Sequence, residues 1–242
     1  MSYSAVETIE KGFKRFTNRN ALILLGVFIG LSSIFGMIAY SFPDFAAALA
    51  VVAIPFLLVL PIVTIRTFFS DETDHIPESA YTDDVWIRVA KALGYYILLI
   101  LASLPALVAF AFGGVLSILG GPLGILVGIL VGIVLAILTV YVWLGLVLVI
   151  YVISLEDKGI IDSVKYSWEL AEGNRIYLLL ISVLISILVT LLGVITLPIS
   201  FFSEFIADVI SVMLQSFGSV LSLSALTYAY KNIVAGAAEG GE

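Results

Sequence analysis

The sequence predicts an all-α membrane protein, in which residues 1–242 form one domain: a bundle of six transmembrane helices. Three observations lead to this prediction. Hydrophobic residues make up 62% of the chain and charged residues only 12%, whereas soluble domains carry about 25% charge. The charges are separated by long uncharged runs, and a helix that spans a bilayer needs about 20 apolar residues. With six helices, all Lys and Arg residues fall on one side of the membrane.

The number of helices follows from the uncharged runs, which are 20–43, 45–65, 92–155, 176–203 and 209–230. Four of these runs hold one helix each, but the third is long enough for two long helices or three short ones. Two helices keep every cation on one side, whereas three would carry Lys158, Lys165 and Arg175 across the membrane. Gly121 and Pro122 supply the turn that the two-helix arrangement requires.

The expected spans are 21–40, 46–68, 93–116, 123–155, 176–197 and 205–233. The positive-inside rule makes the side with the cations cytoplasmic, so both termini are expected in the cytoplasm, with the protein in the cell membrane. The span 123–155 is longer than a bilayer requires. We expect it to tilt or to extend into the cytoplasm.

Amphipathic stretches precede the three helices that lead outward, and we expect them to form helices at the cytoplasmic interface. The first, 4–17, opens with a Ser4–Glu7 capping box. Its apolar face consists of Val6, Ile9, Phe13 and Phe16. The second stretch, 83–93, has Val85, Val89 and Ala92 at matching positions, and the third, 159–172, has Ile161, Val164, Trp168 and Ala171. Each stretch ends at a residue that tolerates a left-handed cap: Asn18, Gly94 or Gly173. Two interpretations stay open: three repeats of an amphipathic helix plus a hairpin, or three independent interfacial stretches.

Small residues recur every four positions in two of the spans. Gly26 and Gly30 form one such ridge, and Gly124, Gly128 and Gly132 form another. Ridges of this kind let helix backbones approach closely in a membrane. Helix packing within the chain is the first interpretation, and formation of a homo-oligomer is the second.

A stripe of polar residues follows one face of the last span. Its members recur every three or four positions: Asp208, Ser211, Gln215, Ser219 and Ser222. Lipid cannot satisfy such groups, so we expect the stripe to face inward. It either forms hydrogen bonds with neighbouring helices or lines a polar cavity.

No catalytic constellation is visible, and no cofactor is expected. The single histidine, His75, lies among carboxylates in the loop 71–78, which we interpret as a solvated acidic loop rather than a site for a divalent ion. The chain has no cysteine, which excludes thiolate metal sites and cysteine nucleophiles. The net charge of −7 argues against nucleic acid as a partner. The spans lack the buried ionisable groups typical of proton-coupled pumps.

One segment resembles a known family. Residues 153–175 contain Glu156-Asp157-Lys158-Gly159, Ser167-Trp168-Glu169-Leu170 and Gly173-Asn174-Arg175. This order is similar to that in uncharacterised archaeal, especially haloarchaeal, multi-pass proteins, which resemble the membrane domain attached to some glycerophosphodiester phosphodiesterases. Ile76-Pro77 and the residues 227–232 also look like that family. The resemblance implies a membrane domain, but not phosphodiesterase activity, because the spans occupy the whole chain.

The expected function is therefore non-enzymatic: an integral membrane protein that organises or supports partner proteins or lipid. Membrane lipid is the expected partner, together with other proteins or further copies of the chain. The alternative is a transporter or channel subunit that uses the polar face of the last span. An intramembrane enzyme is the third hypothesis.

Overall fold

The computed structural model describes residues 4–70, 72–82, 84–194, 198 and 203–239. Within them, six segments are helical, long and apolar enough to cross a membrane, which confirms the predicted fold class. The long helices are α2 (Arg19–Ser41), α3 (Ala46–Ser70), α5 (Val85–Leu119), α6 (Gly121–Leu146), α9 (Arg175–Val194) and α11 (Glu204–Glu239). The shorter ones are α1 (Ala5–Arg15), η1 (Pro43–Phe45), α4 (Glu78–Tyr81), α7 (Val149–Leu155) and α8 (Ile160–Ala171).

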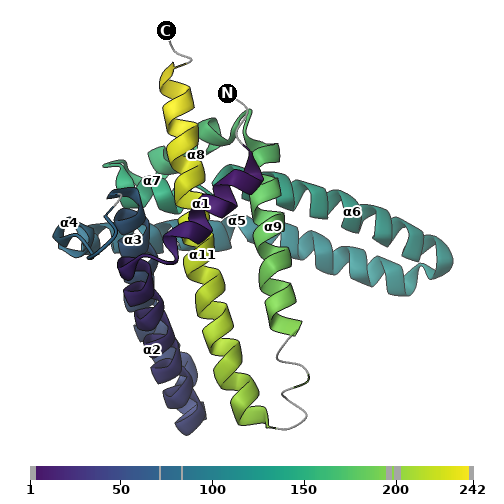
Figure 1. Cartoon of the computed structure of the whole chain (residues 1–242). Helices are drawn as coiled ribbons and strands as arrows, with labels where there is room; N and C mark the ends of the chain where they lie inside the picture. The colour runs from purple at the N-terminus through teal and green to yellow at the C-terminus, as the bar shows by residue number, and fades with distance from the viewer. Residues whose placement is uncertain (1–3, 71, 83, 195–197, 199–202, 240–242) are drawn as a thin grey trace.

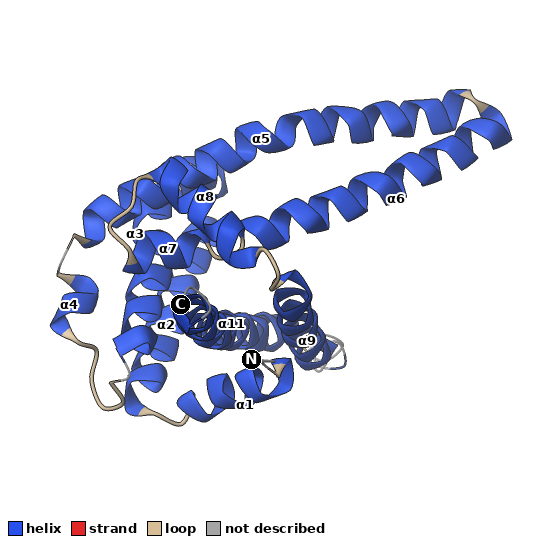
Figure 2. Ribbon diagram, turned by 90° about the horizontal axis from the view of Figure 1, so that it is seen from above, coloured by secondary structure: helices blue, strands red, loops and turns tan. Residues whose placement is uncertain are grey.

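The long helices point in two directions. Helices α2, α9 and α11 run alongside one another, and α3 packs against α2 and α11 (Figure 1). The α5–α6 hairpin instead projects to one side, crosswise to the others (Figures 1 and 2). Its two helices pack on each other along their length and expose large apolar side chains such as Leu107, Leu123 and Ile137. The sequence did not predict this separation of one hairpin from the other four helices.

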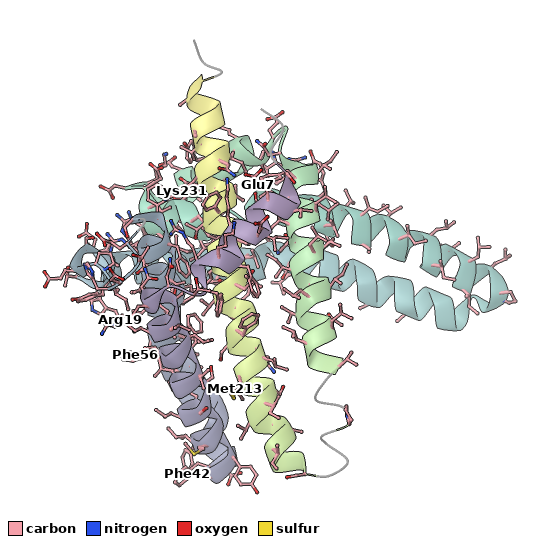
Figure 3. All side chains as sticks on the ribbon, viewed as in Figure 1. Glu7, Arg19, Phe42, Phe56, Met213 and Lys231 are labelled. Atoms are coloured by element: carbon pink, nitrogen blue, oxygen red, sulfur yellow. The ribbon has the colours of Figure 1, made fainter. Side chains whose placement is uncertain are left out.

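The short α-helices and most charged side chains gather at one end of the molecule. We call this end, made of α1, α4, α7, α8 and the adjoining ends of the long helices, the charged layer. Glu7, Arg19 and Lys231 lie toward it, whereas Phe42 and Met213 lie toward the opposite end (Figure 3). The chain segments that carry the Lys and Arg residues meet here, as the sequence predicts.

The core of the protein also lies at this end. Helix α7 is its centre, since Val149, Tyr151, Val152 and Ile153 are all fully buried. One side of α7 packs with residues of α9 and α11, and the other side with residues of α2, α3 and α5. Away from the charged layer, apolar side chains such as Phe42 are exposed. The long helices are therefore fastened together at one end.

The span expected at 123–155 is not one helix. It breaks at Val147 and Leu148, which separate α6 from α7. The break is stabilised by side chains from other elements: Ser167 Oγ donates to the carbonyl oxygen of Gly145 (2.8 Å), and Tyr95 Oη donates to that of Leu146 (3.2 Å). Carbonyl groups that lose their helical partners are therefore bonded elsewhere. The last part of the expected span is the short, buried helix α7.

The three amphipathic stretches have different outcomes. The first and third form α1 and α8, and Ser4 caps α1 by accepting from the backbone N–H of Glu7 (3.4 Å). The second is not a separate helix, because α5 runs without interruption from Val85 through Gly94. Of the three expected left-handed caps, only Gly173 has a positive φ, of +80°; Asn18 is extended.

The buried faces of α1 and α8 are lined by small residues. Thr8 and Gly12 of α1 are buried, as are Ser163 and Ser167 of α8. Among the larger residues predicted to turn inward, Phe16 is buried, while Trp168 is partly buried and Phe13 is half exposed. The contact faces are thus rotated from the apolar stripes, because close docking on another helix requires small side chains.

The three amphipathic segments dock in a cyclic order. Helix α1 packs on α11, the first part of α5 packs on α3, and α8 packs on α6. If the chain is divided into three units, each an amphipathic segment plus a hairpin, every amphipathic segment contacts the second hairpin helix of another unit. This arrangement favours the repeat interpretation over three independent interfacial stretches.

Candidate functional site

Helix α9 stands between α6 and α11 and carries hydroxyl groups along its length. Ser182, Ser186 and Thr190 recur every four residues, so they lie on neighbouring turns of one face. A groove runs along each side of this face, and Ser186 and Thr190 border both. These two grooves are the candidate functional site.

The groove between α9 and α11, which we call the polar groove, has a volume of about 490 Å³. It is lined by Ile185, Ser186, Val189 and Thr190 of α9 and by Gln215, Gly218, Ser219 and Ser222 of α11. Three of the five members of the predicted stripe therefore lie together. Asp208 is exposed nearer the far end of α11, and Ser211 lies one turn from Gln215.

The stripe does not join α11 to its neighbours. Gln215 Nε2 donates to Ser211 Oγ (3.1 Å), and Ser219 Oγ donates to the backbone carbonyl of Gln215 (2.9 Å). Among the described residues, these side-chain hydrogen bonds stay within α11. In the part of the chain that the structure describes, the stripe forms no hydrogen bond to another helix, and Gln215, Ser219 and Ser222 border the groove instead.

Helix α1 closes the end of the polar groove at the charged layer, because it crosses both α9 and α11 (Figure 1). Thr8 Oγ1 lies 2.6 Å from Tyr177 Oη of α9. Ser224 Oγ of α11 donates to the carbonyl oxygen of Gly12 (3.3 Å), and the Phe16 and Phe217 ring centroids are 4.5 Å apart. The groove therefore opens sideways along the helices rather than through this end.

The groove between α6 and α9, which we call the apolar groove, has a volume of about 420 Å³. Its apolar lining is Val140 and Trp143 of α6 and Leu179, Val183, Ile187 and Leu191 of α9. Near the charged layer, the Arg175 guanidinium lies over the rings of Tyr141 and Trp168, with its carbon 3.7 and 4.8 Å from the two centroids. A cation is thus held on aromatic faces one turn beyond Leu179.

The predicted glycine ridges do not mark close helix contacts. Apart from the backbone of its own helix and its chain neighbours, a Cβ atom built on Gly26, Gly30 or Gly132 would meet no atom of the described residues within 4 Å. Gly124 and Gly128 are only partly buried. The prediction of packing within the chain is therefore wrong for Gly26, Gly30 and Gly132.

Other glycines, which the sequence analysis missed, make the close contacts. A Cβ on Gly12 would lie 3.1 Å from the backbone of Ala225, and one on Gly218 would lie 2.8 Å from Val189. Gly145 lies directly against the Trp168 ring. The sequence could have indicated a close contact at Gly12, because this glycine lies on the small-residue face of an amphipathic helix.

The 153–175 segment has structural roles at the charged layer. Glu156 Oε1 accepts a hydrogen bond from Tyr230 Oη of α11 (3.0 Å), and Ser167 bonds the carbonyl of Gly145. Asn174 Nδ2 donates to the carbonyl oxygen of Leu170 (3.0 Å), next to the left-handed Gly173. The quoted motif residues thus tie α7, α8 and α9 to α6 and α11.

Arg88 was not singled out by the sequence, yet it is one of the most constrained polar residues in the structure. It is 8% exposed, and its Nη1 donates to the carbonyl oxygens of Ile153 (2.7 Å) and Glu156 (2.9 Å). These carbonyls lie at the C-terminal end of α7, where a cation is favourable. The sequence could have identified Arg88 as buried, because it lies on the same helix face as Val85, Val89 and Ala92.

The His75 loop shows no metal-binding geometry in the described part of the chain. His75 Nδ1 lies 3.9 Å from Glu72 Oε2, and both side chains are exposed. Among the described residues, no group of three or more His, Asp or Glu side chains is placed to hold an ion. Asp71, which the sequence analysis included in this loop, lies outside the described residues.

Comparison with known proteins gives one result. The model of the family described as "Domain of unknown function (DUF7847)" matches residues 5–236, which is nearly the whole chain. No curated protein and no solved structure matches the chain. The resemblance to archaeal multi-pass proteins and to the membrane domain of glycerophosphodiester phosphodiesterases stays a prediction.

Proposed function

We propose that this chain, which belongs to the DUF7847 family of domains of unknown function, is a non-enzymatic membrane protein that organises lipid or partner proteins. The polar groove is the proposed binding site. Its occupant is a membrane component that enters sideways: a lipid, a helix of a partner protein or a helix of a second copy. We further infer that the charged layer faces the cytoplasm, so that both termini are cytoplasmic, and that the membrane is the cell membrane.

The observation that carries this proposal is the chemistry of the groove lining. Ser186 and Thr190 of α9 face Gln215, Ser219 and Ser222 of α11 across the groove. An amide has two N–H donors and one oxygen acceptor, and Gln215 uses one donor, for Ser211. Because an unsatisfied polar group in hydrocarbon costs several kcal/mol, an occupant that bonds this amide is favoured over plain lipid tails.

A second observation favours the alternative, a transporter or channel subunit. From Asp208 to Ser222 the polar stripe extends over about 21 Å of α11, at about 1.5 Å per residue. That is more than half of a hydrocarbon core of about 30 Å. However, α1 lies across the end of the polar groove, so a pathway along it requires α1 to move away.

The test compares Gln215→Leu with Met213→Leu. Met213 is exposed on the same helix but does not line the polar groove, so it is the matched control. Each purified variant is analysed for the lipid and protein retained from native membranes. The same preparations are then assayed for ion and solute flux in vesicles.

We expect Gln215→Leu to fold and to lose a retained component that Met213→Leu keeps, with no flux in either. If Gln215→Leu retains everything that the unaltered chain retains, the polar groove is not the binding site. If the unaltered chain conducts ions or solutes and Gln215→Leu changes that flux, the transport alternative replaces the proposal.

A further inference from the structure

Arg175 is a cation without a carboxylate partner at the head of the apolar groove. In the described part of the chain it forms no ion pair, although Glu172 is only three residues away. Its Nε atom is buried and has no hydrogen-bond partner. The guanidinium is instead held on the faces of Tyr141 and Trp168. Stacking engages the faces of a guanidinium, whereas its N–H donors point outward in the plane of the group, where an anion can bind them.

The position of Arg175 favours an anion as that ligand. It is the first residue of α9, where the helix dipole is positive and backbone N–H groups lack helical partners. A cation is unfavourable at this end of a helix, whereas a bound anion is stabilised by both the guanidinium and the helix. Planar bidentate recognition of phosphate is typical of arginine.

The apolar groove begins one helical turn after Arg175, at Leu179. Arg175, Leu179, Ser182 and Ser186 recur at intervals of four, three and four residues, so they share one face of α9. The groove follows this face from Leu179 to Leu191, over about 18 Å. Tyr141 and Trp168 lie against Arg175 at the end of the groove near the charged layer, and Trp143 lines the groove; such aromatic residues are typical of the membrane interface.

We propose that the apolar groove holds the hydrocarbon chain of an anionic phospholipid whose phosphate group binds Arg175. One charge at one end of a narrow apolar channel is complementary to an amphiphile with one charged head. A partner helix fits this pattern less well, because the lining offers it an anchor at one end only. The two grooves share Ser186 and Thr190, but Val183 lines only the apolar groove and Gln215 only the polar groove, so this site can be tested separately from the proposed function.

Three variants of the chain test this site against matched controls. Arg175→Gln removes the cation, and Lys165→Gln removes an exposed cation of α8 at the same end. Val183→Trp fills the groove, and Leu180→Trp places the same side chain on an exposed face of α9 outside it. Arg175→Lys keeps the charge but not the planar guanidinium. Each protein is exchanged into phosphatidylcholine vesicles with or without phosphatidylglycerol, and the lipid retained after purification is measured.

We expect preferential retention of phosphatidylglycerol by the unaltered chain and by both controls. Arg175→Gln should weaken this binding at least about tenfold, or 1.4 kcal/mol, and Val183→Trp should do the same while leaving Arg175 in place. Arg175→Lys should retain part of the preference. If Arg175→Gln does not fold, Val183→Trp decides the matter.

Three results would overturn the proposal. Unchanged phosphatidylglycerol binding by Val183→Trp would show that the groove holds no lipid chain. If inorganic phosphate alone competes fully with phosphatidylglycerol and Val183→Trp has no effect, Arg175 binds a free anion rather than a lipid. Retention of a protein instead of phosphatidylglycerol, lost with Val183→Trp, would make the occupant a partner helix and would also reject the lipid.

Discussion

Replacing Gly12 with alanine is expected to destabilise the protein, although alanine is the better helix former. Gly12 lies in the middle of α1, where that helix crosses α11. A Cβ atom there would lie 3.1 Å from the Cα and N atoms of Ala225 and 3.2 Å from its Cβ. Two of these three atoms belong to the backbone and cannot rotate away. The two helices would have to separate, which would also lengthen the hydrogen bond from Ser224 Oγ to the Gly12 carbonyl.

Two effects of the substitution oppose each other. Alanine is favoured over glycine in a helix by about 0.8–1 kcal/mol, while overpacking costs about 1–3 kcal/mol. Gly26→Ala in α2 is the matched control, because its Cβ would meet nothing within 4 Å and it keeps the gain in helix propensity. The difference between the two variants is therefore the steric cost alone. For a chain of this size that cost corresponds to a Tm difference of roughly 2–12 °C.

The measurement is thermal unfolding of both purified variants in the same detergent. We expect the Tm of Gly12→Ala to lie below that of Gly26→Ala, with the unaltered chain between them or close to Gly12→Ala. If Gly12→Ala unfolds at the same temperature as Gly26→Ala or above it, α1 is not held against α11 by close backbone contact. The closed end of the polar groove would then have no structural basis.

Three further predictions concern the charged layer. Arg88→Met should lower the unfolding free energy by about 2–4 kcal/mol in a denaturation assay, because the carbonyl groups at the end of α7 lose their donors. In the same assay, the control Lys91→Met should lower it by only about 0–1 kcal/mol, because the partner Asp157 is exposed. Single cysteines at Asp44 and Gly121 should react with an impermeant thiol reagent in intact cells, and those at Thr73 and Glu172 should not; labelling of Thr73 would reverse the proposed orientation. The pKa of Glu7 lies below its ordinary value, because Lys11 donates a hydrogen bond to the carboxylate and attracts its charge. The Glu7–Lys11 pair therefore stabilises the fold at pH values above the ordinary carboxyl pKa, and this stabilisation is lost as the pH falls through the lowered pKa of Glu7. Glu7→Gln should therefore reduce the decline of Tm on the acid side, and an unchanged profile would show that the pair contributes nothing.

Sequence patterns predicted the spanning helices well, because a helix satisfies its own backbone groups and needs only enough apolar length. The bounds of α2 and α3 agree with the prediction within about two residues, within the ordinary uncertainty of helix ends. The break between α6 and α7 was not predictable in this way. It depends on Ser167 and Tyr95, which come from other helices and bond the carbonyls that the break releases.

The site was predicted in part for the same reason. Gln215, Ser219 and Ser222 share a face of one helix, so their spacing placed them together. Ser186 and Thr190 border the same groove from α9, and only the packing of the two helices brings them there. The glycine ridges failed for a related reason: spacing shows that small residues share a face, but not that another helix covers that face.

The docking of α1 on α11 has a consequence for biosynthesis. Gly12 and Ser224, which are hydrogen-bonded in the folded chain, are 212 residues apart in the sequence. At a translation rate of about 5–20 residues per second, α1 is made about 10–40 s before its partner helix. During that interval its exposed Val6 and Phe13 can hold it at the membrane surface as an interfacial helix. Helix α1 therefore cannot reach its place until α11 has been made, and a nascent chain that stops before α11 presents a free amphipathic helix to the quality-control machinery of the cell.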